Sequence, residues 1–187
     1  MKTDHYEAEV KFEISENDLA SVQDTLRNLG LRHTGKETLE DYYLHTKRSR
    51  YNGWDFVRLR KSNEEYILTQ KTWQQDVNGV LIRQEEEGEV SYTDANEMLQ
   101  RGYKAQLVKT RHDYVGHVEG DELHVSIDFL ELDGATRYFL ECERLVAKED
   151  AAKAREQLRR WVEENLAIDT THEAPSMLEL ITQPSRH

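Results

Sequence analysis

Charged and apolar residues alternate along most of the strand-forming segments of this chain, and no other feature constrains its fold as strongly. Residues 7–12 read Glu-Ala-Glu-Val-Lys-Phe, so an ionic and an apolar residue follow each other at every step. Successive side chains of a strand point to opposite faces, so this segment has one ionic face and one apolar face. The alternation recurs around Arg58 and Arg60 and around Glu141 and Glu143. We therefore expect a chain built largely of strands whose two faces differ in kind.

Turn signals separate these strands and predict how they are connected. Asn78-Gly79, Gly120-Asp121 and Asp133-Gly134 each lie between two strand-like runs, as in antiparallel hairpins. Eight strands are predicted, over residues 6–14, 38–45, 54–61, 66–73, 80–90, 105–118, 123–132 and 137–146. Helices are predicted over residues 16–29, 94–100 and 149–166. Because closure removes exposed strand edges, the predicted fold is α+β, an eight-stranded antiparallel β-barrel with helices packed outside.

Composition limits the protein class. The 187 residues contain 25 basic and 37 acidic residues, a net charge of −12, which argues against nucleic-acid binding through a general basic face. No apolar run is long enough for a membrane span or a signal peptide. The single cysteine, Cys142, excludes an internal disulfide. We expect one domain over residues 1–187, in a cytoplasmic monomer or homodimer that binds neither membrane nor nucleic acid.

The ionic strand faces balance in charge, although the whole chain does not. They carry seven acids and seven bases: Glu7, Glu9, Glu85, Glu87, Asp128, Glu141 and Glu143, and Lys11, Arg58, Arg60, Lys71, Arg83, Lys109 and Arg111. One interpretation places these faces outside the barrel, in water. If they point inward instead, unpaired ions would cost several kcal/mol each, so the interior must hold water, metal and a charged ligand. A polyphosphate chelated to Mg²⁺ or Mn²⁺ fits such a lining, because bases bind phosphate oxygens and carboxylates bind hard cations.

The order of these residues resembles the CYTH superfamily, also called triphosphate tunnel metalloenzymes. Glu7-Ala8-Glu9-Val10-Lys11 is similar to the family's ExExK signature. The rest of the pattern follows in order: Arg58-x-Arg60, Lys71, Arg83-x-Glu85-x-Glu87, Lys109-x-Arg111, Asp128 and Glu141-x-Glu143. The late segment 176–181 is similar to the family's Ser-Tyr-Leu-like terminus, with Met177 in place of the aromatic residue. The resemblance covers nearly the whole chain and implies an eight-stranded triphosphate tunnel.

The resemblance also implies roles for individual residues. It implies divalent-metal ligands at Glu7, Glu9, Asp128, Glu141 and Glu143. It implies triphosphate-binding bases at Lys11, Arg58, Arg60, Lys71, Arg83, Lys109 and Arg111. Glu85 and Glu87 would support them, and Arg83, Glu85 and Glu87 could equally form salt bridges that hold the basic ligands in place.

A catalytic pair is implied by the same resemblance. Tyr43 matches a tyrosine that pairs with the ExExK lysine in hydrolytic members to activate water. Lys11, crowded by other cations, is expected to have a lowered pKa and to serve with Tyr43 as the proton acceptor. His45 departs from the second aspartate of the family's Asp-x-Tyr-x-Asp strand.

Three functions remain open at this point. The first is a metal-dependent triphosphatase acting on the terminal phosphoanhydride of thiamine triphosphate, inorganic triphosphate or a nucleoside triphosphate, with Mg²⁺ or Mn²⁺. The second is a class IV adenylyl cyclase, which would convert ATP to cyclic AMP and pyrophosphate. The third is a non-catalytic binder of polyphosphate or nucleotide. Hydrolysis leads, because Lys11 and Tyr43 are both present and no adenine-reading pattern is recognised.

Overall fold

The computed structural model describes residues 6–45, 56–118 except 76–80, and 120–182. At residues 73–75 and 81–84 it describes the backbone alone. The hairpin expected at Asn78-Gly79 therefore lies outside the described residues.

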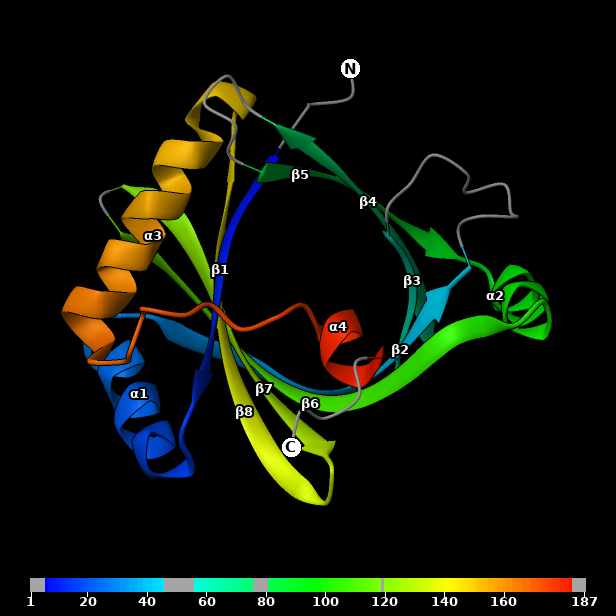
Figure 1. Ribbon diagram of the computed structural model, residues 1–187, viewed down its shortest axis with the longest axis horizontal. Coiled ribbons are helices and arrows are strands. Elements are labelled where there is room, and N and C mark those ends of the chain that lie inside the picture. The colour runs from blue at the N-terminus through cyan, green and yellow to red at the C-terminus, as the bar shows by residue number, and fades with distance from the viewer. Residues whose placement is uncertain (1–5, 46–55, 76–80, 119, 183–187) are drawn as a thin grey trace.

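Eight antiparallel strands form a closed barrel, as predicted (Figure 1). Each strand pairs with two neighbours, and only β1 pairs with strands distant in sequence on both sides. In barrel order the strands are β1 (Tyr6–Ile14), β5 (Leu81–Val90), β4 (Glu65–Gln75), β3 (Phe56–Ser62), β2 (Arg32–Leu44), β6 (Tyr103–Val118), β7 (Asp121–Leu132) and β8 (Ala135–Val146).

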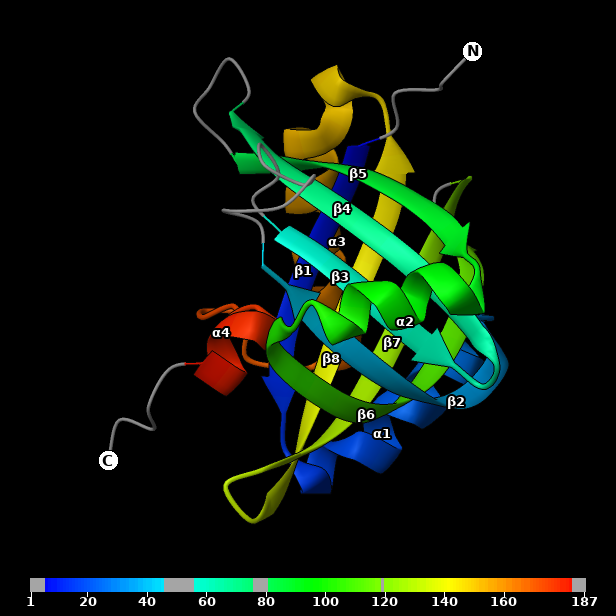
Figure 2. The same cartoon turned by 90° about the vertical axis from the view of Figure 1, so that its right-hand side faces the viewer.

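In the described part of the chain, four α-helices accompany the barrel. They are α1 (Glu16–Asn28), α2 (Tyr92–Gln100), α3 (Ala151–Leu166) and α4 (Met177–Thr182). Helices α1 and α3 cover one side of the barrel, α2 lies on the opposite side, and α4 lies at one mouth (Figures 1 and 2). The Ser15 and Ser91 hydroxyls cap α1 and α2 by accepting hydrogen bonds from backbone N–H groups of their first turns. No helix in the described part of the chain is long and apolar enough to cross a membrane.

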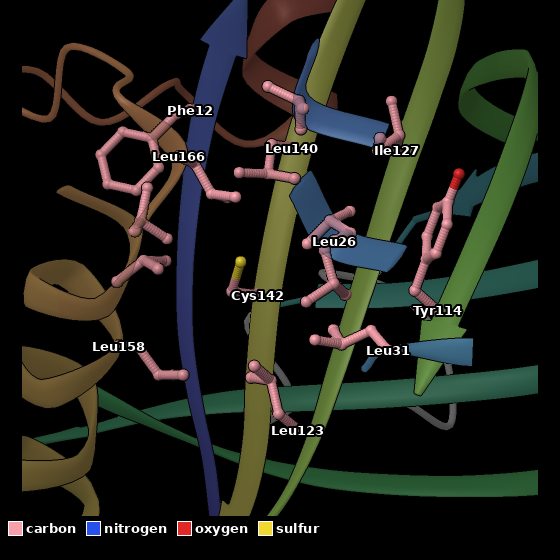
Figure 3. Packing of buried hydrophobic residues seen from close by; sticks show 14 of the residues in the cluster. Phe12, Leu26, Leu31, Tyr114, Leu123, Ile127, Leu140, Cys142, Leu158 and Leu166 are labelled. Carbon is pink, nitrogen blue, oxygen red and sulfur yellow. The ribbon is translucent and has the colours of Figure 1, made fainter. Parts of the chain in front are cut away.

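The main hydrophobic core lies outside the barrel, between its wall and the helices. Apolar side chains of β1, β7 and β8, such as Phe12, Ile127 and Leu140, pack against Leu26 of α1 and Leu158 of α3 (Figure 3). Cys142 is buried in the same cluster as a free thiol. Because the apolar strand faces point outward to the helices, the ionic faces line the interior of the barrel.

The structure differs from the predicted secondary structure at the start of β2 and at α4, where the sequence pattern is weak. Strand β2 begins at Arg32, six residues before the predicted start, and pairs with β6 from there on. Its first residues are exposed and polar, so no apolar period marks them. Helix α4 was not predicted, because six residues are too few to show a helical period. The N-terminus of α4 is capped by two hydrogen bonds: the Ser176 hydroxyl donates to the Glu179 carboxylate and accepts from the Glu179 backbone N–H.

The barrel is closed unevenly around β1. One edge of β1 pairs with β8 from Tyr6 to Ile14. The other edge pairs with β5 only at Tyr6 and Glu7 in the described residues. Residues 167–176, which we call the strap, connect α3 to α4 and pass across β1 (Figure 1). The strap donates a backbone hydrogen bond from Ala174 N to Lys11 O at 2.8 Å.

Candidate active site

A cavity of about 240 Å³ lies in the barrel interior against α4. Its wall contains five bases, Lys11, Arg58, Lys71, Lys109 and Arg111, and the carboxylates of Glu9 and Glu141. Tyr43, Phe56 and residues 176–179 of the strap and α4 complete it. The structure thus brings together most of the predicted phosphate-binding bases from β1, β3, β4 and β6.

Arg58 and Arg60 differ in how the protein engages them. Arg60 makes a two-pronged ion pair with the fully buried Asp41, at 2.7 and 2.9 Å. Arg58 donates to Thr69 Oγ1 at 3.0 Å, and its nearest carboxylates, on Glu87 and Asp41, are 3.5 and 3.8 Å away. The buried Nε of Arg58 has no hydrogen-bond partner in the described part of the chain. Arg58 therefore keeps a donor for a ligand, whereas Arg60 is committed to Asp41.

Asp41 is a site residue that the sequence reasoning missed as a functional group. It pairs in register with Arg60 across β2 and β3 and lies two residues from Tyr43 on the same face. Burial alone would raise the pKa of Asp41, but Arg58 and Arg60 hold it well below its usual range. Its place on the strand face of Tyr43, opposite Arg60, is the signal that could have identified it.

A second ionic group surrounds Asp128 on β7. Its Oδ1 accepts from Arg111 Nε at 2.7 Å, and its Oδ2 accepts from Lys109 Nζ at 2.6 Å and Arg111 Nη2 at 2.8 Å. Arg111 reaches onward to Glu141 at 3.3 Å. Burial and the neighbouring Arg111 lower the pKa of Lys109 to about 7, although Asp128 opposes this. Both oxygens of Asp128 are therefore used to hold bases.

Lys11 and Tyr43 have pKa shifts that differ from the expectation. Lys11 Nζ lies 2.6 Å from Glu141 and 3.9 Å from Glu9. Burial lowers the pKa of Lys11, but these carboxylates outweigh it and the pKa is raised, so the predicted lowering is wrong. Burial and Asp41 raise the pKa of the Tyr43 hydroxyl. Its ring packs on Phe56, with centroids 5.4 Å apart. Both groups are protonated at neutral pH in this structure.

Two carboxylates share the ammonium group of Lys71 in the interior, and a third carboxylate lies next to one of them. Lys71 Nζ lies 2.9 Å from Glu7 and 2.6 Å from Glu85. Glu7 also interacts by hydrogen bonds with both Glu85 and Glu143. Burial and the charge of Glu7 raise the pKa of Glu85 to about 8 and raise that of Glu143 well above its usual range. Like charges this close are stable only if protons or a cation lie between them.

The donor set fits a hard divalent cation that keeps some of its water. Among the described residues, no three His, Cys, Asp or Glu side chains are grouped as a complete ligand set. Mg²⁺ is commonly held by one or two carboxylates, with water and substrate phosphates as its other ligands. The Glu7 and Glu143 carboxylates, which now share a hydrogen bond, are oxygen donors of this kind. A cation would replace the shared proton.

The remaining residues named from the sequence lie in β5 and directly after β2. Glu87 is half exposed and accepts from Thr69 Oγ1 at 2.5 Å. Arg83 lies in β5 in register with Glu7, but its side chain is outside the described residues. His45 follows the end of β2 and is exposed.

We expect the metal-free protein to lose thermal stability as the pH rises from about 4.5 to about 7, because above pH 7 the lowered pKa of Lys109 opposes the fall. Glu85 binds its proton more tightly in the folded state, where its pKa is about 8, than in the unfolded state. The folded protein therefore binds more protons in this window, and its stability falls as they are removed. Thermal denaturation should show a fall in Tm of roughly 5 °C.

The matched control for this prediction is Glu85→Gln, which cannot titrate. Its Tm should change much less over the same pH range, and added Mn²⁺ should reduce the fall in the wild type. A wild-type Tm that is constant or rises across the window would contradict the assignment of shared protons to this cluster.

Comparison with known protein families agrees with this geometry. The model of the CYTH domain matches residues 5–174, which is most of the chain. The chain belongs to the CYTH family. CYTH proteins are triphosphate-processing enzymes that depend on divalent metal. No curated protein is significantly similar to this CYTH protein in sequence.

Solved structures share the fold of this CYTH protein. The PH1819 protein from Pyrococcus horikoshii OT3 is 30% identical, with a TM-score of 0.67 over 94% of this chain and 97% of its own. A conserved hypothetical protein from Pyrococcus furiosus is 25% identical, with a TM-score of 0.66 over 94% and 99%. The cyclase candidate HpAC1 from Hippeastrum, described as having a dominant triphosphatase activity, is 16% identical, with a TM-score of 0.58 over 94% of both chains.

Proposed function

We propose that this CYTH protein is a metal-dependent triphosphatase that hydrolyses the terminal phosphoanhydride of inorganic triphosphate, thiamine triphosphate or a nucleoside triphosphate. The observation that carries the proposal is the cavity of about 240 Å³ with five basic side chains in its wall. Bases converging on an enclosed site fit a ligand with several anionic oxygens, and hydrogen bonds between ions are the strong ones. Burial strengthens them further, because the interior screens charge less than water does.

Divalent cations would be held by carboxylates of the interior. We assign this role to Glu7, Glu9, Glu141 and Glu143. Asp128, expected as a fifth ligand, has both oxygens on Lys109 and Arg111, and we assign it to fixing these two bases. When bound, Mg²⁺ or Mn²⁺ supplies charge neutralisation at the phosphate oxygens.

The bases would bind and orient the triphosphate. Arg58 would offer its unpartnered Nε, and Lys71, Lys109 and Arg111 would contact further oxygens from two sides of the cavity. Such positioning and electrostatic stabilisation provide most of the catalysis in phosphoryl transfer. Arg60 supports the site indirectly, because it holds Asp41. Arg83 stays in the proposed set on the strength of its register opposite Glu7.

Water would be activated near Lys11 and Tyr43, which both line the cavity. Because both are protonated, neither accepts a proton as it stands. Lys11 Nζ lies 2.6 Å from Glu141 Oε2, an ion pair in which Lys11 keeps its proton, because the pKa of Lys11 is raised and that of Glu141 is lowered well below its usual range. We propose that Lys11 and Tyr43 hold the attacking water and that its proton passes to an oxygen of the phosphate group that is released.

A substrate panel tests the reaction. Inorganic triphosphate, thiamine triphosphate and ATP are each incubated with the protein and Mg²⁺ or Mn²⁺, and phosphate, pyrophosphate and cyclic AMP are measured. We expect phosphate release that is lost on adding EDTA and restored by excess Mn²⁺. Tight binding without any turnover would contradict the proposal and favour a binding protein.

Cyclisation of ATP is the second candidate. Phe56, Met177 and Leu178 give the cavity an apolar wall on which an organic group could pack. HpAC1 shares the fold and is described both as a cyclase candidate and as a triphosphatase, so the fold alone does not choose between the reactions. Formation of cyclic AMP and pyrophosphate in the panel would select the cyclase.

A further inference from the structure

The second edge of β1 carries the backbone of two proposed site residues. Beyond Glu7 this edge has no strand partner in the described part of the chain. The carbonyl oxygens of Glu9 and Lys11 lie on it, two residues apart, and would otherwise lack a partner on that side. They are satisfied from outside the sheet, by Arg155 of α3 and by Ala174 of the strap.

Arg155 connects these partners. Its Nε donates to the Glu9 carbonyl oxygen at 3.1 Å. Its Nη2 lies 2.5 Å from a carboxylate oxygen of Glu173, the residue before Ala174 in the strap. Ala174 N in turn donates to Lys11 O at 2.8 Å. One guanidinium group thus joins α3, the open edge of β1 and the strap.

The strap leads directly into the wall of the cavity. Two residues after Ala174, Ser176 begins the stretch that lines the cavity, which continues to Glu179. Met177 is buried against Tyr43 and Phe139 at this end of the barrel. The position of this wall and the position of the Glu9 and Lys11 backbone therefore depend on the same contact.

We propose that Arg155 is a positioning residue, which fixes the backbone of Glu9 and Lys11 and, through Glu173, the strap and α4 over the triphosphate cavity. This inference rests on the proposed function for its ligand, inorganic triphosphate. Arg155 itself does not line the cavity, so it acts through the residues that it holds. Its planar fork suits this task, because separate N–H groups reach a carbonyl and a carboxylate at once.

Arg155→Met tests the proposal, because methionine keeps much of the bulk and removes both contacts. Binding of inorganic triphosphate is measured by calorimetry in EDTA, which prevents metal-dependent turnover. Hydrolysis is measured separately with Mn²⁺. We expect about tenfold weaker binding and a similar rise in KM, with kcat changed by less than about threefold, as for a lost charged hydrogen bond. Arg155→Lys should restore part of the affinity.

The matched control is Arg159→Met, one turn further along α3. Arg159 donates to the strap at Thr170 O, but that contact does not involve β1. This variant loosens the strap and leaves the bond to Glu9 O in place, so its triphosphate affinity should stay within about twofold of the wild type. Equal losses in both variants would overturn the role of Arg155 on β1. A lower Tm for Arg155→Met with unchanged triphosphate affinity would show that Arg155 only stabilises the fold, and would contradict the proposal.

Failure of the proposed function can be distinguished from failure of this inference. If the wild type binds triphosphate without hydrolysing it, the triphosphatase proposal fails, and the binding series still decides on Arg155. If the wild type binds no triphosphate, the role of Arg155 is tested by amide hydrogen exchange in residues 6–14 of β1 and 177–182 of α4. Faster exchange in Arg155→Met than in Arg159→Met supports the link, and equal exchange overturns it.

Discussion

Replacement of Arg58 by methionine is expected to lower kcat/KM for triphosphate hydrolysis by about 100- to 1000-fold, as measured for other preorganised donors. Arg58 lines the cavity and has a buried Nε without a partner in the described residues, so this donor is not committed to another protein group. The fold should tolerate the change, because Asp41 keeps its two-pronged pair with Arg60. Steady-state kinetics and thermal denaturation measure the two effects.

Arg60→Met is the matched comparison, and its main effect should be on stability and not on kcat/KM. It leaves Asp41 fully buried, with Arg58 3.8 Å away as its closest remaining ion pair. Breaking a buried pair in this way costs about 3–5 kcal/mol of stability. An Arg58 variant with near wild-type kinetics, or an Arg60 variant with wild-type stability, would refute the division of labour between these two arginines.

Asp128→Asn is expected to lower the free energy of unfolding by about 3–5 kcal/mol, as much as Arg60→Met. Asp128 has no exposed surface, and it is the carboxylate that Lys109 and Arg111 both contact at 2.6–2.8 Å. Asparagine removes the negative charge, so the buried Arg111 loses its main ion pair and Lys109, whose pKa Asp128 raises, gives up its proton. Equilibrium unfolding in urea measures the change.

Glu122→Gln, on the same strand, is its control. Glu122 is exposed and contacts His124 at 2.9 Å on the surface, where solvent screens the pair, so the loss should be much smaller than for Asp128→Asn. If Asp128→Asn proved as stable as Glu122→Gln, Asp128 would not be the anchor of the two bases, and its role as a direct metal ligand would gain support.

The alternation of charge along the strands and the turn signals were sufficient to predict the barrel, and the resemblance to the CYTH superfamily implied that the ionic faces point inward. Lys11 and Arg58 line the cavity, and each lies between two apolar neighbours in its strand, Val10 and Phe12 for Lys11 and Val57 and Leu59 for Arg58. Local pattern carried this information, since side-chain direction has a period of two.

The division of roles within the interior could not be read from the sequence, because it depends on register between distant strands. Arg58 and Arg60 are equivalent in the pattern, but the pairing of Asp41 with Arg60 separates them. The direction of the Lys11 pKa shift depends on the closeness of Glu141, which is 130 positions away in the chain. The short α4 helix and its place at the barrel mouth also carry no periodic signal.

The ion-lined interior has a consequence for behaviour at high temperature. The free energy of hydrating charged groups becomes less favourable as a solution is heated, so the penalty for keeping ions away from bulk water shrinks. A barrel that holds Asp41, Asp128 and their basic partners in its centre therefore pays less for its lining when hot than when cold.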